Sequence, residues 1–267
     1  MNRPTTSVQV VALRPEGPFE RPDRVVTEEP LQVRLSLPGG PEVDVAVTLR
    51  TPGNDTELAV GLLVTEGIIT SGTDVAAVRV GSDAVTVALR GEPASPPAQR
   101  RFVASASCGT CGKASVDDLE VAGPPLGPGP VVPRSVLVDL PERLRGGQRL
   151  FDRTGGLHAA GRFTAAGEAQ AVREDVGRHN AVDKVVGAAA LAGELPLTEE
   201  VLVVSGRVSF EIVQKAAVAG LAVLAAVSAP SSLAVSAARR RGVTLVGFVR
   251  DGTANVYTHP ERIDLDR

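Results

Sequence analysis

The sequence predicts an α/β fold, a layered sheet with helices on both faces, preceded by an N-terminal β-rich portion. From Glu168 onward, short runs rich in Val, Leu and Ala alternate with longer stretches of helical period. This alternation is typical of βαβ units, in which helices cover a mostly parallel sheet. Before residue 90, apolar residues alternate singly between Gly- and Pro-containing breaks, a pattern typical of hairpins.

The N-terminal half contains the predicted hairpins. Residues 1 to about 24 combine Arg, Pro and Glu without a period, which predicts a loose arm. Residues 25–37 and 42–49 alternate around Pro38-Gly39-Gly40 and predict two paired strands. The other elements expected here are a helix capped at 54–56, strands at 75–80 and 84–90, a loop at 91–99 and a strand at 101–107 that leads to the first cysteine.

The C-terminal half has the more regular pattern. The predicted order is strand 168–173, helix 178–192, strand 201–205, helix 209–219, strand 222–227, helix 231–241 and strand 243–249. Ligands of such sheets bind beyond the carboxyl ends of the strands, so a site is expected at that edge. A Pro/Gly-rich seam near 122–133 separates the halves, and we expect residues 25–267 to form one domain.

The composition excludes several classes of protein. The 267 residues are 43% hydrophobic and 22% charged, with a formal net charge of −3, which predicts a globular chain without a basic surface for nucleic acid. No apolar run is long enough to cross a bilayer, and the first residues lack the pattern of a secretory signal. We therefore expect a cytoplasmic protein that binds neither membrane nor nucleic acid.

The only two cysteines, Cys108 and Cys111, lie close together in the segment SCGTCGK at 107–113. A pair at this spacing is no disulfide framework for a chain of this length, and it indicates redox, nucleophilic or metal-binding chemistry in a reducing compartment. A glycine after each cysteine lets the loop bend, and Lys113 favours the reactive thiolate. Two apolar cysteines packed in a turn are the structural alternative, which the shared glycine-flanked loop disfavours.

Several chemistries compete for these cysteines. Structural zinc needs further ligands, and the three histidines form no spaced ligand pair, so we expect no metal site. A zinc deaminase would need His-x-Glu before the cysteines, whereas His259-Pro260-Glu261 follows them and contains proline. A thiol–disulfide oxidoreductase remains an alternative, although its cysteines normally open a helix. Sulfur relay needs a nucleophilic thiol that accepts sulfur as a persulfide, and a bendable loop suits it.

Polar residues follow the predicted strands. Gly177-Arg178-His179-Asn180, Ser205-Gly206-Arg207 and Ser231-Ser232 each stand where a helix is expected to begin. Helix N-termini favour phosphate through their free N–H groups and dipole. Helix capping and ion pairing explain each motif equally well, so the roles of Arg178, His179, Ser205 and Arg207 stay open at this stage. Their concentration at successive strand ends favours a nucleotide-like ligand.

Seven segments between residues 50 and 250 carry a family resemblance. They are RTPG at 50–53 with ELA at 57–59 and EGII at 66–69, SCGTCG at 107–112, TGGLHAAG at 154–161, EDVGRHNAVDKVVG at 174–187, SGRVSFEIVQKAAVAG at 205–220, SAPSSLAV at 228–235, and TLVGFVR at 244–250. Two of them have fourteen residues or more, and all follow one order. Together they make the sequence similar to the formate dehydrogenase accessory sulfurtransferase family, FdhD.

The resemblance implies a cytidine-deaminase-like fold without deaminase activity, usually dimeric. It also implies a sulfurtransferase that takes sulfur from a cysteine desulfurase and passes it to the molybdenum bis(guanine dinucleotide) cofactor before insertion into formate dehydrogenase. By position, Cys108 matches the cysteine that carries the persulfide, with Cys111 as its partner. The segment implied to bind the cofactor comprises Phe248, Val249, Arg250, Asp251, Gly252 and Thr253. A non-catalytic chaperone for the cofactor remains an alternative.

Overall fold

The computed structural model describes residues 3–96 and 123–266. The predicted strand at 101–107 and both cysteines, Cys108 and Cys111, lie outside the described residues. In the described part, no helix is long and apolar enough to cross a membrane. Short elements outside the two large sheets are the 3-10 helices Gly72–Asp74 and Pro260–Arg262, the helix α3 (Phe151–Thr154), and the parallel pair β7 (Val132–Pro133) and β14 (Ile263–Asp264).

The largest sheet of the described residues has six strands in the order β13-β12-β11-β10-β8-β9. Their bounds are β8 His158–Thr164, β9 Ala169–Asp175, β10 Glu200–Val204, β11 Val223–Ala226, β12 Thr244–Arg250 and β13 Thr253–Thr258. The four predicted strands, β9 to β12, all run in one direction, as expected. However, β8 lies between β9 and β10 and is antiparallel to both, and β13 is antiparallel to β12. The sheet is therefore mixed, because two strands that the sequence analysis did not assign complete it.

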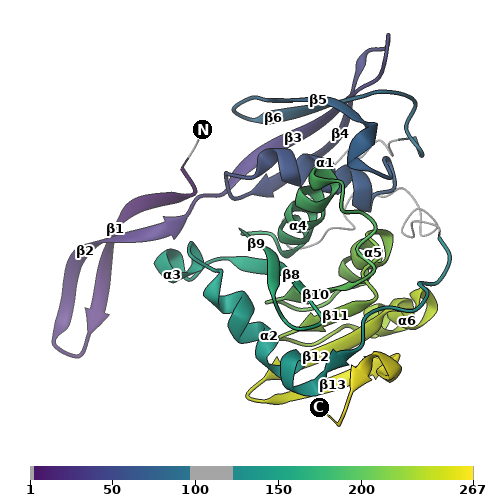
Figure 1. Cartoon of the computed structure of the whole chain (residues 1–267). Coiled ribbons are helices and arrows are strands. Elements are labelled where there is room, and N and C mark those ends of the chain that lie inside the picture. Colours follow the sequence, from purple (N-terminus) through teal and green to yellow (C-terminus); the bar gives the residue numbers. More distant parts are fainter. Residues whose placement is uncertain (1–2, 97–122, 267) are drawn as a thin grey trace.

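Helices cover both faces of this sheet, which confirms that part of the predicted architecture (Figure 1). On one face lie α4 (Arg178–Ala192), α5 (Phe210–Val218) and α6 (Ser232–Arg241), and on the other lies α2 (Arg134–Gly146). Successive residues of β10 show the division: Leu202 and Val204 belong to the core beneath α4 and α5, whereas Val201 and Val203 belong to the core beneath α2. Helix α2 was not predicted.

The N-terminal β-rich portion forms a second sheet of four strands, in the order β4-β3-β6-β5. Its strands are β3 Glu29–Ser36, β4 Glu42–Arg50, β5 Val75–Val80 and β6 Ala84–Leu89. Helix α1 (Asp55–Thr65) lies between this sheet and α4 (Figure 1). It begins where expected, but Asn54 is left-handed (φ 58°) and its side chain caps nothing.

Two glycines allow α1 and α4 to cross in backbone contact. A Cβ atom placed on Gly61 would lie 1.8 Å from the carbonyl oxygen of Asp183, and one on Gly187 would lie 1.8 Å from that of Glu57. Such distances are far below van der Waals contact, so neither position accepts a larger residue without separating the helices. The crossing joins the N-terminal sheet to the C-terminal one through a single large core.

The N-terminal arm is the clearest difference from the sequence analysis. Residues 1 to about 24 were expected to be loose, but β1 (Thr5–Arg14) and β2 (Gly17–Val26) form a regular antiparallel hairpin. The predicted strand 25–37 is accordingly split, since its first residues end β2 and β3 begins at Glu29. Pro18 and Pro22 misled the prediction, because proline is tolerated in a strand whose missing N–H faces away from the neighbour. Figure 1 shows this hairpin projecting from the body of the molecule.

Candidate functional site

A cavity of about 390 Å³ lies at the carboxyl ends of the parallel strands. Ser205 follows β10, Val227 follows β11, and Arg250 ends β12, and all three line it. The opposite wall comes from α2 and the turn after it, and includes Asp139, Glu142, Arg145 and Gln148. The cavity thus stands at the edge where the sequence analysis expected a ligand, but half of its wall comes from the unpredicted helix.

The segment 248–253 reaches this cavity with its second half. Arg250, Asp251 and Gly252 line it. Val249 is fully buried in the core beneath α2 and does not line the cavity. The hydroxyl of Thr253 donates to the carbonyl oxygen of Arg250 at 2.9 Å and thereby closes the turn. The structure therefore divides the six predicted residues into three that line the cavity and three that surround them.

The backbone of this segment is unusual. Asp251 and Gly252 have φ values of 52° and 70°, as expected for the two central residues of a tight hairpin turn between β12 and β13. Phe248 also has a positive φ of 53°, which is costly for a residue with a side chain. Its N–H donates to the carbonyl oxygen of Ser228. The centroid of its ring lies 5.5 Å from the guanidinium carbon of Arg250. Phe248 thus helps to position Arg250.

A second group of polar residues lies at the N-termini of α4 and α5. His179 Nε2 lies 3.1 Å from the hydroxyl oxygen of Ser209 and 2.9 Å from a carboxylate oxygen of Glu211. Both ionisable side chains are almost completely buried. Burial alone would raise the pKa of Glu211, but the hydrogen bond and charge of His179 outweigh it and lower that pKa. The pair joins the two helix starts.

His158 lies at the start of β8, beside the same strand ends. The hydroxyl of Ser205 accepts from the N–H of Ala159, and the N–H of Ser205 donates to the carbonyl oxygen of Ala159. Burial lowers the pKa of His158 below its ordinary value of 6.5, and the positive charges of Arg178, His179 and Arg207 lower it further. The neutral form of His158 is therefore favoured, because burial and the neighbouring positive charges all disfavour its protonation. The ring of His158 lies beside Gly206 and near Arg178 and His179, at the start of α4.

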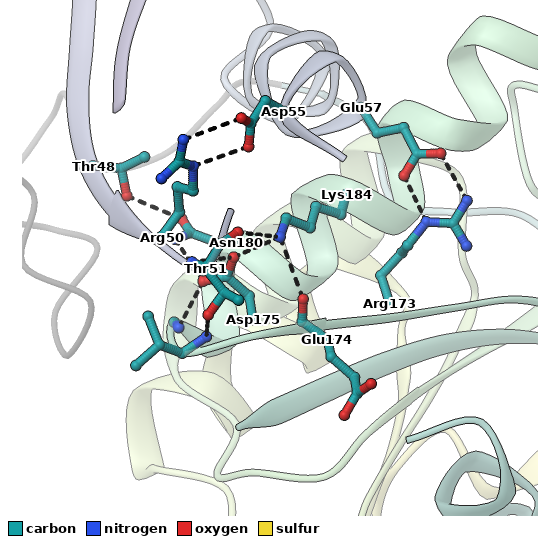
Figure 2. A network of polar contacts seen from close by, with 12 residues as sticks. Thr48, Arg50, Thr51, Asp55, Glu57, Arg173, Glu174, Asp175, Asn180 and Lys184 are labelled. Atoms are coloured by element: carbon teal, nitrogen blue, oxygen red, sulfur yellow. Dashed lines mark hydrogen bonds and ion pairs between the residues drawn. The ribbon is translucent and has the colours of Figure 1, made fainter. Parts of the chain in front are cut away.

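The motif at 174–184 has a structural role that Figure 2 shows. The carboxylate of Asp175 is fully buried and accepts from the N–H groups of Thr51 and Gly177 and from the amide of Asn180. Lys184 lies 2.7 Å from it. These contacts tie the RTPG segment, which follows β4, to the loop that starts α4.

Lys184 extends the same network through its ammonium group. It donates to the carbonyl oxygens of Thr51 and Glu174, and only 1% of its side chain is exposed. The carboxylate of Glu174 in turn accepts from the N–H groups of Leu150 and Phe151, at the start of α3. The network therefore fixes three segments around the start of α4, and so the place of Arg178 and His179.

Two further ion pairs hold α1 in place (Figure 2). Arg50 is almost fully buried and makes a bidentate contact with Asp55 in the first turn of α1. Arg173 of β9 makes another with Glu57, and this hydrogen bond raises the pKa of Arg173 above its ordinary value. Bidentate pairs fix orientation as well as distance. Arg50 is thus engaged within the protein and is not offered to a ligand.

Part of this site has no signal in the sequence. Glu211 stands two residues after Ser209 in a predicted helix, and nothing in the sequence distinguishes it from an exposed acidic residue of a first turn. Arg145 and Gln148 were missed because the helix that carries them was not predicted. Among the described residues, no three His, Cys, Asp or Glu side chains are arranged to hold a metal ion.

Comparison with known proteins identifies the family. The sequence pattern of the FdhD/NarQ family matches residues 26–264, which is most of the chain. The chain belongs to this family. It is 48% identical over 280 residues to "Sulfur carrier protein FdhD" of Streptomyces coelicolor, covering 99% of this chain and 98% of that protein. An archaeal member, "Sulfur carrier protein FdhD" of Sulfolobus acidocaldarius, is 45% identical over 243 residues, covering 91% and 92%.

The fold of an FdhD/NarQ chain is also seen in a solved structure. A crystal structure of a protein from Desulfotalea psychrophila, described as a putative formate dehydrogenase accessory protein, matches with a TM-score of 0.76. The match covers 97% of this chain and 99% of that one at 24% identity. At this identity the likeness shows a shared fold, including the arrangement of several sheets, and confirms the mixed α/β architecture.

Proposed function

We propose that this chain is a sulfur carrier that accepts sulfur as a persulfide on Cys108 from a cysteine desulfurase. It then transfers the sulfur to the molybdenum bis(guanine dinucleotide) cofactor before the cofactor enters formate dehydrogenase, in the cytoplasm. The observation that carries the proposal is the 48% identity, over almost the whole chain, to a protein named as a sulfur carrier. We expect the cofactor to bind in the cavity at the carboxyl ends of the strands.

The first step is a thiol exchange that needs no external oxidant or reductant. The Cys108 thiolate attacks the terminal sulfur of the desulfurase persulfide, a new S–S bond forms, and the desulfurase cysteine leaves as a thiolate. Cys108 then carries the persulfide.

Release requires two electrons, because the persulfide sulfur must reach the level of sulfide. We assign this step to Cys111: its thiolate attacks the inner sulfur of Cys108, a Cys108–Cys111 disulfide forms, and sulfide passes to the metal in exchange for an oxo group that leaves as water. The disulfide must then be reduced by a cellular dithiol before another cycle. This scheme gives the two cysteines different roles.

The cavity of about 390 Å³ suits one guanine nucleotide end of the cofactor better than a bare phosphate. Arg250 and Arg145 supply guanidinium groups for phosphate oxygens. Asp251, Glu142 and Asp139 line the same space and would repel phosphate, but carboxylates accept from the N–H groups on the guanine edge. We therefore propose that the acidic residues read guanine while the arginines bind the diphosphate.

Intact-protein mass spectrometry tests the proposal. The chain is incubated with a cysteine desulfurase and cysteine, with Cys108→Ala and Cys111→Ala as the matched variants. We expect the mass of one sulfur atom on the wild type and on Cys111→Ala, removable by a thiol reductant, and none on Cys108→Ala. Sulfur that remains on Cys108→Ala, or no sulfur on the wild type with a desulfurase that sulfurates another acceptor, would overturn the proposal and leave a cofactor chaperone as the better account.

A further inference from the structure

Gln148 is a buried polar residue in the wall of the cavity at the carboxyl ends of the strands. Only 4% of this residue is exposed, and its side-chain amide forms no hydrogen bond with another described residue. Most buried amides in folded proteins are hydrogen-bonded, because an amide that leaves water without a new partner costs stability. The two polar atoms of the amide are not completely enclosed. They therefore face space in the cavity, where a ligand can supply the missing partners.

The charged side chains of the same wall are placed differently. All five charged residues that line the cavity are exposed: Asp139, Glu142, Arg145, Arg250 and Asp251. Leu144, by contrast, lines the cavity and is almost fully buried, as Gln148 is. Gln148 and Leu144 therefore form the floor of the cavity, and the charges surround its opening. A ligand with a flat, uncharged end and a charged end fits this division, with the uncharged end at Gln148.

The backbone that carries Gln148 is held in place on both sides. Its N–H donates to the carbonyl oxygen of Arg145 at 3.1 Å, and its carbonyl oxygen accepts from the N–H of Asp152 at 3.2 Å. Immediately beyond it, the carboxylate of Glu174 accepts from two N–H groups at the start of α3, at 2.8 and 2.7 Å. A side chain on a fixed backbone loses less conformational freedom when a ligand binds. The amide of Gln148 is thus prepared for one geometry.

The amide of Gln148 has a donor that the acidic residues of the cavity lack. Carboxylates accept from the N1–H and the 2-amino group of guanine, but they repel its O6 oxygen, which needs a donor. The guanidinium groups at the opening are engaged by phosphate in the function proposed above. We propose that Gln148 is a specificity-determining residue, whose amide nitrogen donates to the O6 oxygen of a guanine base at the floor of the cavity. This role rests on the proposed guanine site and adds a residue to it.

The same arrangement rejects adenine. An amide that rotates by half a turn accepts from the 6-amino group of adenine, but the neighbouring N1 atom then faces a carboxylate, and both are acceptors. The rejection thus needs Gln148 together with an acidic residue at the opening. Ser205 is the other neutral side-chain donor that lines the cavity. Its hydroxyl oxygen accepts from the N–H of Ala159 at 2.9 Å, which directs it to the backbone of β8.

Calorimetry of the full chain with GDP and 6-thio-GDP tests the proposal. The thio analogue keeps the N1–H and 2-amino donors and replaces only O6 by sulfur, a weaker acceptor. We expect the wild type to bind GDP about fivefold more tightly than 6-thio-GDP. Gln148→Met, of similar size, should weaken GDP binding about tenfold and remove the preference between the two ligands. Gln170→Met is the matched control, because Gln170 is an exposed residue of β9 that does not line the cavity, and it should behave as the wild type does.

A second variant gives a reading that loss of folding cannot imitate. Gln148→Glu replaces the donor by an acceptor, so its preference should shift from GDP towards the diphosphate of 2,6-diaminopurine riboside, whose 6-amino group donates. An unchanged preference in both Gln148 variants would overturn the proposal, and so would a preference for GDP over 6-thio-GDP that is lost in Ser205→Ala but kept in Gln148→Met.

The outcomes separate this role from the proposed function. Binding of GDP that is equally tight in the wild type and in Gln148→Met rejects the role of Gln148 and leaves the guanine site in place. A wild type that does not bind GDP rejects the guanine site and the role of Gln148 together. Persulfide formation on Cys108 is measured independently by mass spectrometry, so neither result decides it.

Discussion

The ammonium group of Lys184 lies 2.7 Å from the carboxylate of Asp175, and both side chains are almost completely excluded from solvent. Every other polar contact of Asp175 in the network comes from a backbone or amide donor of the segments it joins. Separating the charges would leave one of them buried without compensation. The pair therefore makes the loop before α4 dependent on the segment after β4.

Replacing Asp175 by asparagine should lower the free energy of unfolding by about 3–5 kcal/mol, because the charge of Lys184 is then buried alone. Urea unfolding measures the loss. The double variant Asp175→Asn, Lys184→Met should recover part of it, since the unpaired charge is gone. Additive losses from the two single variants would show that the residues do not act as a pair.

Replacing Gly187 by alanine should destabilise the chain by about 1–3 kcal/mol or more, because the new methyl group meets the carbonyl oxygen of Glu57 at 1.8 Å. Gly146 provides the control: it ends α2, and a Cβ atom there would touch nothing. Gly146→Ala should therefore stabilise by about 0.4–1 kcal/mol. Thermal unfolding compares the two, and equal effects would refute the close crossing of α1 and α4.

His158 predicts a dependence of stability on pH. Its pKa is lowered in the folded state, so the unfolded chain binds the proton more tightly. Stability from this group is complete above the ordinary pKa of 6.5 and falls as the pH drops below it. His158→Gln should remove this component, so the difference in melting temperature between wild type and variant should change between pH 7.5 and about pH 5.5. A difference that is constant over this range would contradict the lowered pKa.

Arg250 and Asp251 should contribute differently to nucleotide binding. With GDP as the probe in calorimetry, Arg250→Ala should weaken binding about tenfold or more through the lost phosphate contact. Asp251→Asn should reduce the preference for GDP over ADP. Arg149→Ala, an exposed arginine near the cavity that does not line it, is the control and should bind as the wild type does. Equal affinity of the wild type for GDP and ADP would contradict guanine recognition in the cavity.

The regular alternation after residue 168 predicted β9 to β12 and the helices between them, because buried strands and amphipathic helices leave clear periods. It could not predict that β8 lies between β9 and β10, since strand order depends on pairing across the sheet. Helix α2 was not predicted because it contains Pro141, and proline is untypical of a helix interior. The Pro/Gly-rich seam before it also indicated a loop. The hairpin β1–β2 was hidden because its prolines are tolerated only at outward-facing positions, which the sequence does not mark.

For the site, the sequence indicated the edge of the sheet at which the cavity lies and three residues that line this cavity, Arg250, Asp251 and Gly252. That a ligand binds there remains a prediction. It could not show that the side chain of Val249 is buried, because a residue beside a turn has the same local pattern whichever face it occupies. The roles of Cys108 and Cys111 rest on family membership, and they remain predictions.

The central claim is that sulfur bound at Cys108 reaches the cofactor. The most direct test loads the wild type with ³⁵S-labelled persulfide, adds sulfur-free molybdenum cofactor and formate dehydrogenase lacking it, and follows the label into the cofactor and the recovered activity. We expect transfer of label together with activation by the wild type, and neither with Cys108→Ala. Activation by Cys108→Ala equal to that of the wild type, or activation without transfer of label, would contradict it.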